Sequence, residues 1–203
     1  MNTARDLAII VMSASDREVG QGDLSLALAG AEVLDLVEAQ VVGLDGDRLV
    51  PGTGSATGDR LLDEAAASLV RQAPYEPVED WLWRRGRELS AAYTDELERT
   101  GVLIRTRGHR ILSRTERKVL VDSPARREAE ERRASGEPVL AALTGAVGLH
   151  DGADDDKDAE LGLSDDVTTS VLAAVGDAVM ELEAVRQRRS IENAAFDNIW
   201  RGL

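Results

Sequence analysis

The segment TGDRLLDEA, residues 57–65, decides the fold expected for this chain. From Leu61 onward, apolar residues recur at i, i+1, i+4 and i+5, which is the pattern of one face of an amphipathic helix. Thr57 or Asp59 can cap the first turn, and Asp63 lies near its positive end, where acids are favoured. The segment therefore predicts a helix start, and a metal site built from Asp59 and Asp63 is the alternative interpretation.

Helix-and-hairpin patterns lie on both sides of this segment. Upstream, residues 24–40 (LSLALAGAEVLDLVEAQ) predict an amphipathic helix, and two short apolar runs around Asp45-Gly46 predict a type I′ hairpin. Downstream, residues 78–101 (VEDWLWRRGRELSAAYTDELERTG) predict one long helix. The next segment, residues 102–112 (VLIRTRGHRIL), predicts a second hairpin around Gly108.

The C-terminal part continues the helical pattern. An Arg/Glu-rich helix is expected after Pro124 and an apolar helix over residues 138–150, followed by an acidic loop over residues 151–166. Residues 167–200 then predict either one long helix or two consecutive helices. Because aromatic residues make up only 3% of the chain and Ala, Leu, Glu and Arg are abundant, we expect a mainly helical single domain over residues 1–203.

Charge is distributed unevenly along the chain. The net charge is −14, yet residues 81–133 carry 14 Lys/Arg against 9 Asp/Glu, whereas the rest carries 10 against 29. This split predicts a basic face that can approach an anionic partner; the alternative is that these arginines pair with nearby acids. A strongly acidic chain repels a polyanion, so no nucleic-acid partner is expected.

Motifs for catalysis, metals or cofactors are weak. The glycine-rich segment 52–58 (GTGSATG) lacks the Lys-Ser/Thr of a phosphate-binding loop, and His109 and His150 are not part of a hydrolase motif. The acidic loop has aspartates at EF-hand positions 1, 3 and 5, but Ala159 stands where the sharp turn needs glycine. With no cysteine in the chain, thiolate chemistry and disulfides are excluded. We therefore expect neither catalytic residues nor a metal or cofactor.

The hydrophobic segments are short. The apolar run Leu7–Met12 is too short for a signal-peptide core, and no stretch of ~20 apolar residues is available to span a bilayer. The expected location is the cytoplasm, with peripheral association at the inner membrane face as an additional expectation.

Four segments, in order and at their spacing, resemble the Golgi phosphoprotein 3 family in its bacterial branches. They are ALAGAEVLDLVEAQ (27–40) before a hairpin, TGDRLLDEA, LERTGVL (97–103) before a second hairpin, and an apolar helix ending in GLHDGAD (148–154). The resemblance implies an all-α domain with a central helical bundle wrapped by amphipathic helices, two small β-hairpins and no catalytic activity. Eukaryotic relatives bind phosphatidylinositol 4-phosphate and the cytosolic tails of Golgi enzymes.

The resemblance also implies a lipid head-group site. The family pocket combines a Trp, an Arg within a Leu-Arg-Gly motif and two Arg three residues apart, and these positions fall on Gly20, Ala29, Arg87 and Ser90. Only Arg87 keeps its pocket side chain, and the small residues cannot replace the bidentate bonds of arginine. The implied phosphatidylinositol 4-phosphate pocket is thus only partly retained.

A second cluster of aromatic and basic residues comes just before Arg87. Trp81, Trp83, Arg84 and Arg85 could form an exposed face for an anionic membrane interface, or the tryptophans could be packing residues beside solvated arginines. Two functions remain open: a peripheral protein that binds anionic lipid, and a soluble module that has lost lipid binding and acts through protein partners. Homo-oligomer formation through the second hairpin is a further expectation.

Overall fold

The computed structural model describes residues 2–14, 17–107, 116–149 and 165–201, which form eight α-helices and two antiparallel two-stranded sheets. The helices are α1 (Thr3–Ser13), α2 (Gln21–Glu38), α3 (Arg60–Ala67), α4 (Val78–Arg85), α5 (Leu89–Arg99), α6 (Pro124–Ala134), α7 (Pro138–Ala146) and α8 (Asp166–Arg201). The strands are β1 (Val42–Asp45), β2 (Arg48–Pro51), β3 (Leu103–Arg107) and β4 (Glu116–Leu120). The mainly helical fold with two small hairpins is confirmed.

Helix α2 is the centre of the bundle. It packs against α1, α3, α4, α5, α7, α8 and β1. Its apolar and small side chains are buried around nearly the whole circumference between Leu24 and Leu36, as expected for a helix enclosed by others. The predicted amphipathic helix over residues 24–40 is therefore a core helix.

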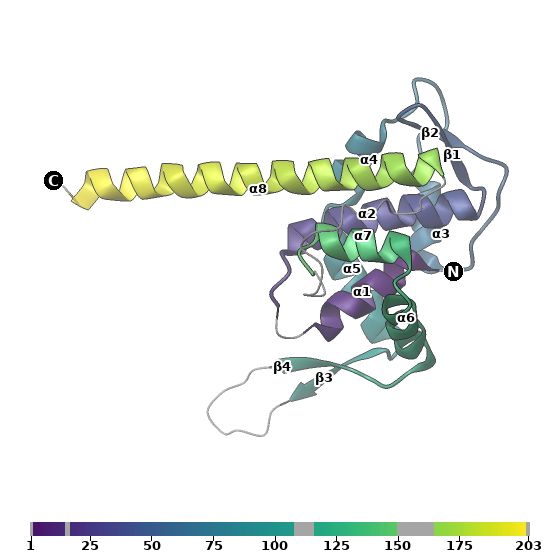
Figure 1. The fold of residues 1–203 in the computed structure, drawn as a ribbon, viewed down its shortest axis with the longest axis horizontal. Helices are drawn as coiled ribbons and strands as arrows, with labels where there is room; N and C mark the ends of the chain where they lie inside the picture. The colour runs from purple at the N-terminus through teal and green to yellow at the C-terminus, as the bar shows by residue number, and fades with distance from the viewer. Residues whose placement is uncertain (1, 15–16, 108–115, 150–164, 202–203) are drawn as a thin grey trace.

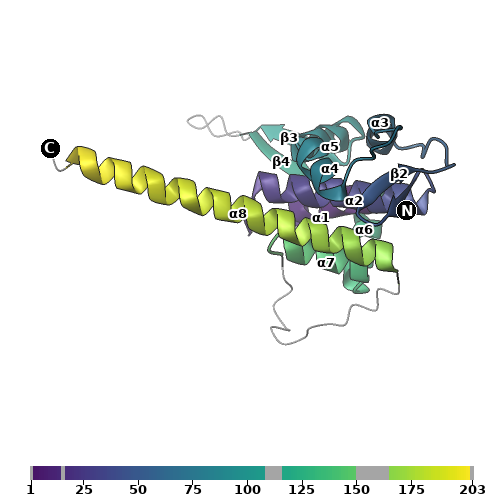
Figure 2. The ribbon, with the colours of Figure 1, turned by 90° about the horizontal axis from the view of Figure 1, so that it is seen from above.

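Helix α8 is one continuous helix of 36 residues, about 54 Å long at 1.5 Å per residue. Its first half lies along α2 and buries Val171, Val175 and Ala178, whereas its second half extends away from the body (Figures 1 and 2). Of the two forms predicted for residues 167–200, the single helix is the one observed. No helix in the described part of the chain has the length and apolar character needed to cross a membrane.

The two hairpins differ in detail from the predictions. In the first, Asp45 pairs with Arg48, so the turn residues are Gly46 and Asp47 rather than Asp45-Gly46. Only Gly46 has positive φ, +61°, which is the pattern of a type II′ turn with glycine first and not of type I′.

In the second hairpin, β3 lies where predicted, but its partner strand is Glu116–Leu120 and not the run just after Gly108. Residues 108–115, which include His109, lie outside the described residues. Ile104 and Val119 are directly opposite each other on the two strands, and their exposed fractions are 45% and 38%.

Candidate functional site

A groove of about 480 Å³ lies between the first turn of α2, the junction of α4 and α5, and α8. Its walls are mostly small and apolar and include a single arginine. Its lining includes Gly22, Ser25, Trp83, Arg87, Ser90 and Leu182.

The junction of α4 and α5 places Arg87 at this groove. The single helix predicted for residues 78–101 is wrong, because Glu88 adopts a left-handed conformation with φ +57°. At Gly86 the backbone approaches α2, and a Cβ there would lie 2.5 Å from the carbonyl oxygen of Leu82 and 3.3 Å from that of Ser25. The chain turns at this point, and Arg87 is exposed with no hydrogen bond or ion pair to any residue in the described ranges.

Two helix N-termini lie at the groove. The buried Ser90 N–H at the start of α5 donates to Ser25 Oγ of α2 at 3.0 Å, which ties the two helices together. Gly20 and Glu88, the N-cap residues of α2 and α5, form no side-chain capping bond. In α5 the first N–H groups already donate to Ser25 Oγ and to the carbonyls of Gly86 and Glu88, so it is the positive end of α2 that is available to an anion.

The four positions implied by the resemblance do not all meet here. Arg87 and Ser90 line the groove, and Gly20 directly precedes the first α2 residue that lines it. Ala29 lies elsewhere: it is fully buried, and its carbonyl accepts a hydrogen bond from Trp81 Nε1 at 3.3 Å.

The exposed aromatic and basic face expected at Trp81, Trp83, Arg84 and Arg85 is not present. Trp81 and Arg85 are four residues apart and share the inward side of α4, since such residues lie one above the other on a helix. Trp81 is fully buried, and the Arg85 side chain is only 16% exposed. Arg84 is exposed but binds Glu76 at 2.6 and 2.7 Å, so only the half-buried Trp83 belongs to the groove.

Arg85 instead completes a buried polar network around Glu32 of α2. Its Nε and Nη2 donate to the two Glu32 carboxylate oxygens at 2.7 and 2.8 Å, and Tyr93 Oη donates to the same carboxylate at 3.2 Å. Arg85 also donates to the carbonyl of Leu61 at 3.1 Å, so the network joins α2, α3, α4 and α5. Burial raises the pKa of Glu32 above its ordinary value, although Arg85 acts in the opposite direction.

Most of the basic middle region is neutralised in the same way. Arginines of this region pair with nearby acids, which is the alternative to an exposed basic face. The pairs include Arg84–Glu76, Arg99–Glu96, Arg105–Glu98, Arg126–Glu130 and Arg132–Asp6. Hydrogen bonding to Arg99 lowers the pKa of Glu96 to about 2. A surface of paired arginines attracts an anion weakly. Arg87, which has no partner among the residues that the structure describes, is therefore the stronger candidate to bind one.

Arg186 of α8 lies next to the groove, beside Gly20 and Gly22 of α2, and no sequence pattern pointed to it. Its Nη1 binds both carboxylate oxygens of Asp23, in the first turn of α2, at 2.8 and 2.7 Å. The two residues are 163 positions apart, so no local pattern links them. The available signal was the pair of glycines, Gly20 and Gly22, which marks a close approach of another element to α2.

The segment TGDRLLDEA is the helix start that its pattern predicts. Asp59 caps α3 by accepting from the N–H groups of Leu61 and Leu62 at 2.9 and 3.1 Å. Asp63 accepts from the N–H and hydroxyl of Thr57 at 2.7 and 2.9 Å. Both carboxylates thus have partners within the protein, and the described residues contain no group of three or more metal-ligating side chains.

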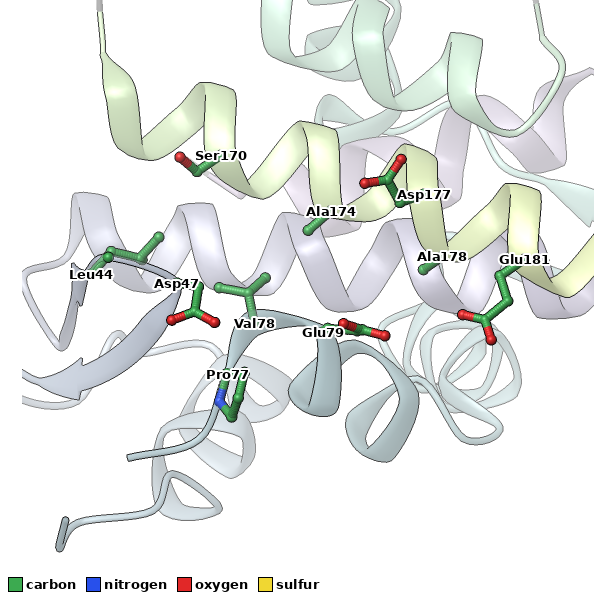
Figure 3. Close-up of a pocket in the computed structure, with 11 residues that line it drawn as sticks. Leu44, Asp47, Pro77, Val78, Glu79, Ser170, Ala174, Asp177, Ala178 and Glu181 are labelled. Atoms are coloured by element: carbon green, nitrogen blue, oxygen red, sulfur yellow. The ribbon is translucent and has the colours of Figure 1, made fainter. Parts of the chain in front are cut away.

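A second groove, of about 360 Å³, lies between the first hairpin, the start of α4 and α8 (Figure 3). Apolar side chains such as Val78 and Ala174 form part of its lining. Four acids also line it: Asp47, Glu79, Asp177 and Glu181. This groove would repel an anion and suits a positively charged partner.

The acidic loop over residues 151–166 lies outside the described residues except for its last two. Asp165 accepts from the N–H of Val167 and from the hydroxyl of Thr168, at 3.3 and 3.1 Å, just before α8 begins at Asp166. EF-hand positions 1, 3 and 5, which are Asp154, Asp156 and Asp158, lie outside the described residues, as does His150, whereas Asp165 is the residue at position 12.

Comparison with known proteins identifies the family. No curated protein matches the chain. The family model described as Golgi phosphoprotein 3 (GPP34) matches residues 4–189, which is most of the 203-residue chain and includes both the groove and Arg186. The chain therefore belongs to the Golgi phosphoprotein 3 family.

Proposed function

We propose that the protein is a non-enzymatic peripheral membrane protein that binds a phosphate-bearing lipid head group in the groove beside Arg87. The proposal rests on the exposed Arg87 guanidinium, which has no partner among the residues that the structure describes. The neighbouring arginines Arg84, Arg85 and Arg186 are each paired with a carboxylate. Family membership supports a phosphoinositide, since the family is known for binding phosphatidylinositol 4-phosphate.

The surroundings of Arg87 suit an anion of modest size. The N-terminus of α2 has no side-chain cap and lies at the groove, and backbone N–H groups at helix starts are common phosphate ligands. The half-buried Trp83 supplies an amphipathic ring of the kind found at membrane interfaces. We place the protein in the cytoplasm, at the inner face of the membrane.

Vesicle co-sedimentation tests this function. Wild-type protein is mixed with neutral vesicles, vesicles containing phosphatidylserine and vesicles containing phosphatidylinositol 4-phosphate, at low and near-physiological salt. We expect selective binding to the phosphoinositide, and Arg87→Glu should weaken it about tenfold or more, as expected for a lost charge-assisted contact. The matched control is Arg71→Glu, which makes the same charge change at an exposed site outside the groove.

Equal binding of the Arg87→Glu variant and the Arg71→Glu control would refute the proposal. Binding to any anionic vesicle that disappears with salt would indicate a diffuse electrostatic attraction without head-group recognition.

The second candidate is a protein-interaction module without lipid binding. The acid-lined groove of Figure 3 favours it, because four carboxylates around apolar residues complement a basic amphipathic segment. The exposed Ile104–Val119 pair supports the additional proposal of self-association through the second hairpin. Sedimentation velocity of wild type and Ile104→Glu tests it, and the variant should be the smaller species.

A further inference from the structure

A second guanidinium, that of Arg186, lies beside the first turn of α2, next to the groove that Arg87 lines. Its Nη2 atom lies 2.9 Å from where a Cβ on Gly22 would be, and 3.3 Å from the corresponding position on Gly20. Gly22 lines the groove, and so does Leu182, one turn before Arg186 on α8. Arg186 therefore borders the groove at the N-terminal end of α2.

The guanidinium of Arg186 retains unused donors. Only Nη1 binds Asp23, and the same atom lies 3.6 Å from a Glu183 carboxylate oxygen. Nη2 and Nε make no hydrogen bond to residues that the structure describes. The side chain is 39% exposed, so a ligand can reach it. Because a guanidinium carries five N–H groups, Arg186 can hold Asp23 and still donate to an anion.

Two glycines make room for this arrangement. A Cβ on Gly22 would lie only 2.7 Å from Leu182 Cδ2, and a Cβ on Gly20 would overlap the Asp23 carboxylate. Without side chains at these positions, α8 approaches the first turn of α2 closely enough for Arg186 to sit beside its N–H groups. An anion bound there would be attracted both by the Arg186 guanidinium and by the positive end of the α2 dipole.

We propose that Arg186 and Arg87 together hold the phosphate of a phosphomonoester head group, with Asp23 fixing the orientation of Arg186. This inference rests on the proposed function and deepens it, since it adds a second phosphate-binding arginine from α8. Asp23 and Glu88 offset the two positive charges of the site. The directed donors, and not net charge, then select a phosphomonoester over the phosphodiester and carboxylate of phosphatidylserine.

Three variants test the role of Arg186. Arg186→Ala removes the guanidinium, and Arg186→Lys keeps the charge and a bond to Asp23 but removes the fork of donors. Arg189→Ala is the matched control, since Arg189 is exposed on the same helix and forms no hydrogen bond or ion pair with the residues that the structure describes. Thermal melts by circular dichroism check that each variant is folded. If Arg186→Ala does not fold, Arg186→Lys still tests the role of the guanidinium.

Binding is measured on phosphatidylinositol 4-phosphate vesicles and, by calorimetry, on free inositol 1,4-bisphosphate. We expect both Arg186 variants to bind about tenfold more weakly in both assays, with Arg189→Ala unchanged. Competition of the free head group with vesicles would support a phosphate site. Vesicle binding without any competition would overturn the head-group assignment in favour of a general membrane surface.

The remaining outcomes separate this inference from the proposed function. If Arg87→Glu loses vesicle binding while both Arg186 variants bind like wild type, the role of Arg186 is refuted and the proposed function stands. If wild-type protein binds neither ligand, both proposals fail.

Discussion

Replacing Glu32 with alanine would remove the carboxylate at the centre of the buried network. Arg85, 16% exposed, would lose two hydrogen bonds of 2.7 and 2.8 Å, and Tyr93 would lose one of 3.2 Å. Because this leaves a buried cation without a counter-ion, we expect a loss of about 3–5 kcal/mol in the free energy of unfolding. For a chain of this size that is a fall in Tm of roughly 6–20 °C.

Thermal and urea unfolding, followed by circular dichroism, measure this loss. Glu130→Ala is the control, because Glu130 forms an ion pair of 2.7 Å with Arg126 on the exposed face of α6. Its loss should lower the free energy of unfolding by no more than about 0.5 kcal/mol. Arg85→Met combined with Glu32→Ala should be more stable than the sum of the two single losses predicts, since it removes both charges.

A Tm for Glu32→Ala within about 2 °C of wild type would refute the reasoning, since it is far below the shift expected for a broken buried pair. Strict additivity of the two substitutions would refute it as well, because residues that share hydrogen bonds should be energetically coupled.

Three further predictions concern α1, α3 and the contact between α2 and α8. Burial raises the pKa of Asp35 to about 6, although the carboxylate accepts hydrogen bonds from the N–H groups of Thr3 and Ala4. Because the folded state favours the protonated carboxyl, the contribution of Asp35 to stability is greatest below pH ~4 and declines as pH rises through 6. Between pH 4 and 7, the free energy of unfolding measured in urea should shift in favour of Asp35→Asn relative to wild type by about 2 kcal/mol, and a gap independent of pH would contradict this. Asp59→Ala removes the cap of α3 and should reduce the free energy of unfolding by about 1 kcal/mol, whereas an unchanged urea midpoint would contradict the capping role. Gly22→Leu should displace α8 and lower the Tm by several degrees in a thermal melt, and a Tm equal to that of wild type would argue against the close contact.

Local patterns predicted the elements whose cause is local. The capped start of α3 and the apolar face that follows it could be read from residues 57–65, since the capping groups and the helix are adjacent. The break between α4 and α5 could not, because Glu88 is not a residue type that favours positive φ, and the bend at Gly86 depends on the approach of α2. The second strand of the second hairpin was misplaced because β4 begins at Glu116, too far along the chain from the end of β3 at Arg107 for the tight turn that the pattern around Gly108 predicts.

The candidate site shows the same division. Counting from the resemblance placed Arg87 and Ser90 beside the groove, since both lie near the start of one helix. Arg85 was misjudged because its partner, Glu32, is 53 residues away and looks in sequence like any acid on an amphipathic helix. Arg186 depends on how α8 folds back on α2, and the spacing of residues in the sequence carries no information about that contact.

The length of α8 gives the groove a mechanical property. A continuous helix moves as a rod, and this one is held against α2 from Val171 as far as Arg186, whose Nη1 binds Asp23. The part of α8 beyond Arg186 extends for about 22 Å, so a force on its far end would act as a lever on the contact between Arg186 and Asp23, beside the proposed phosphate site.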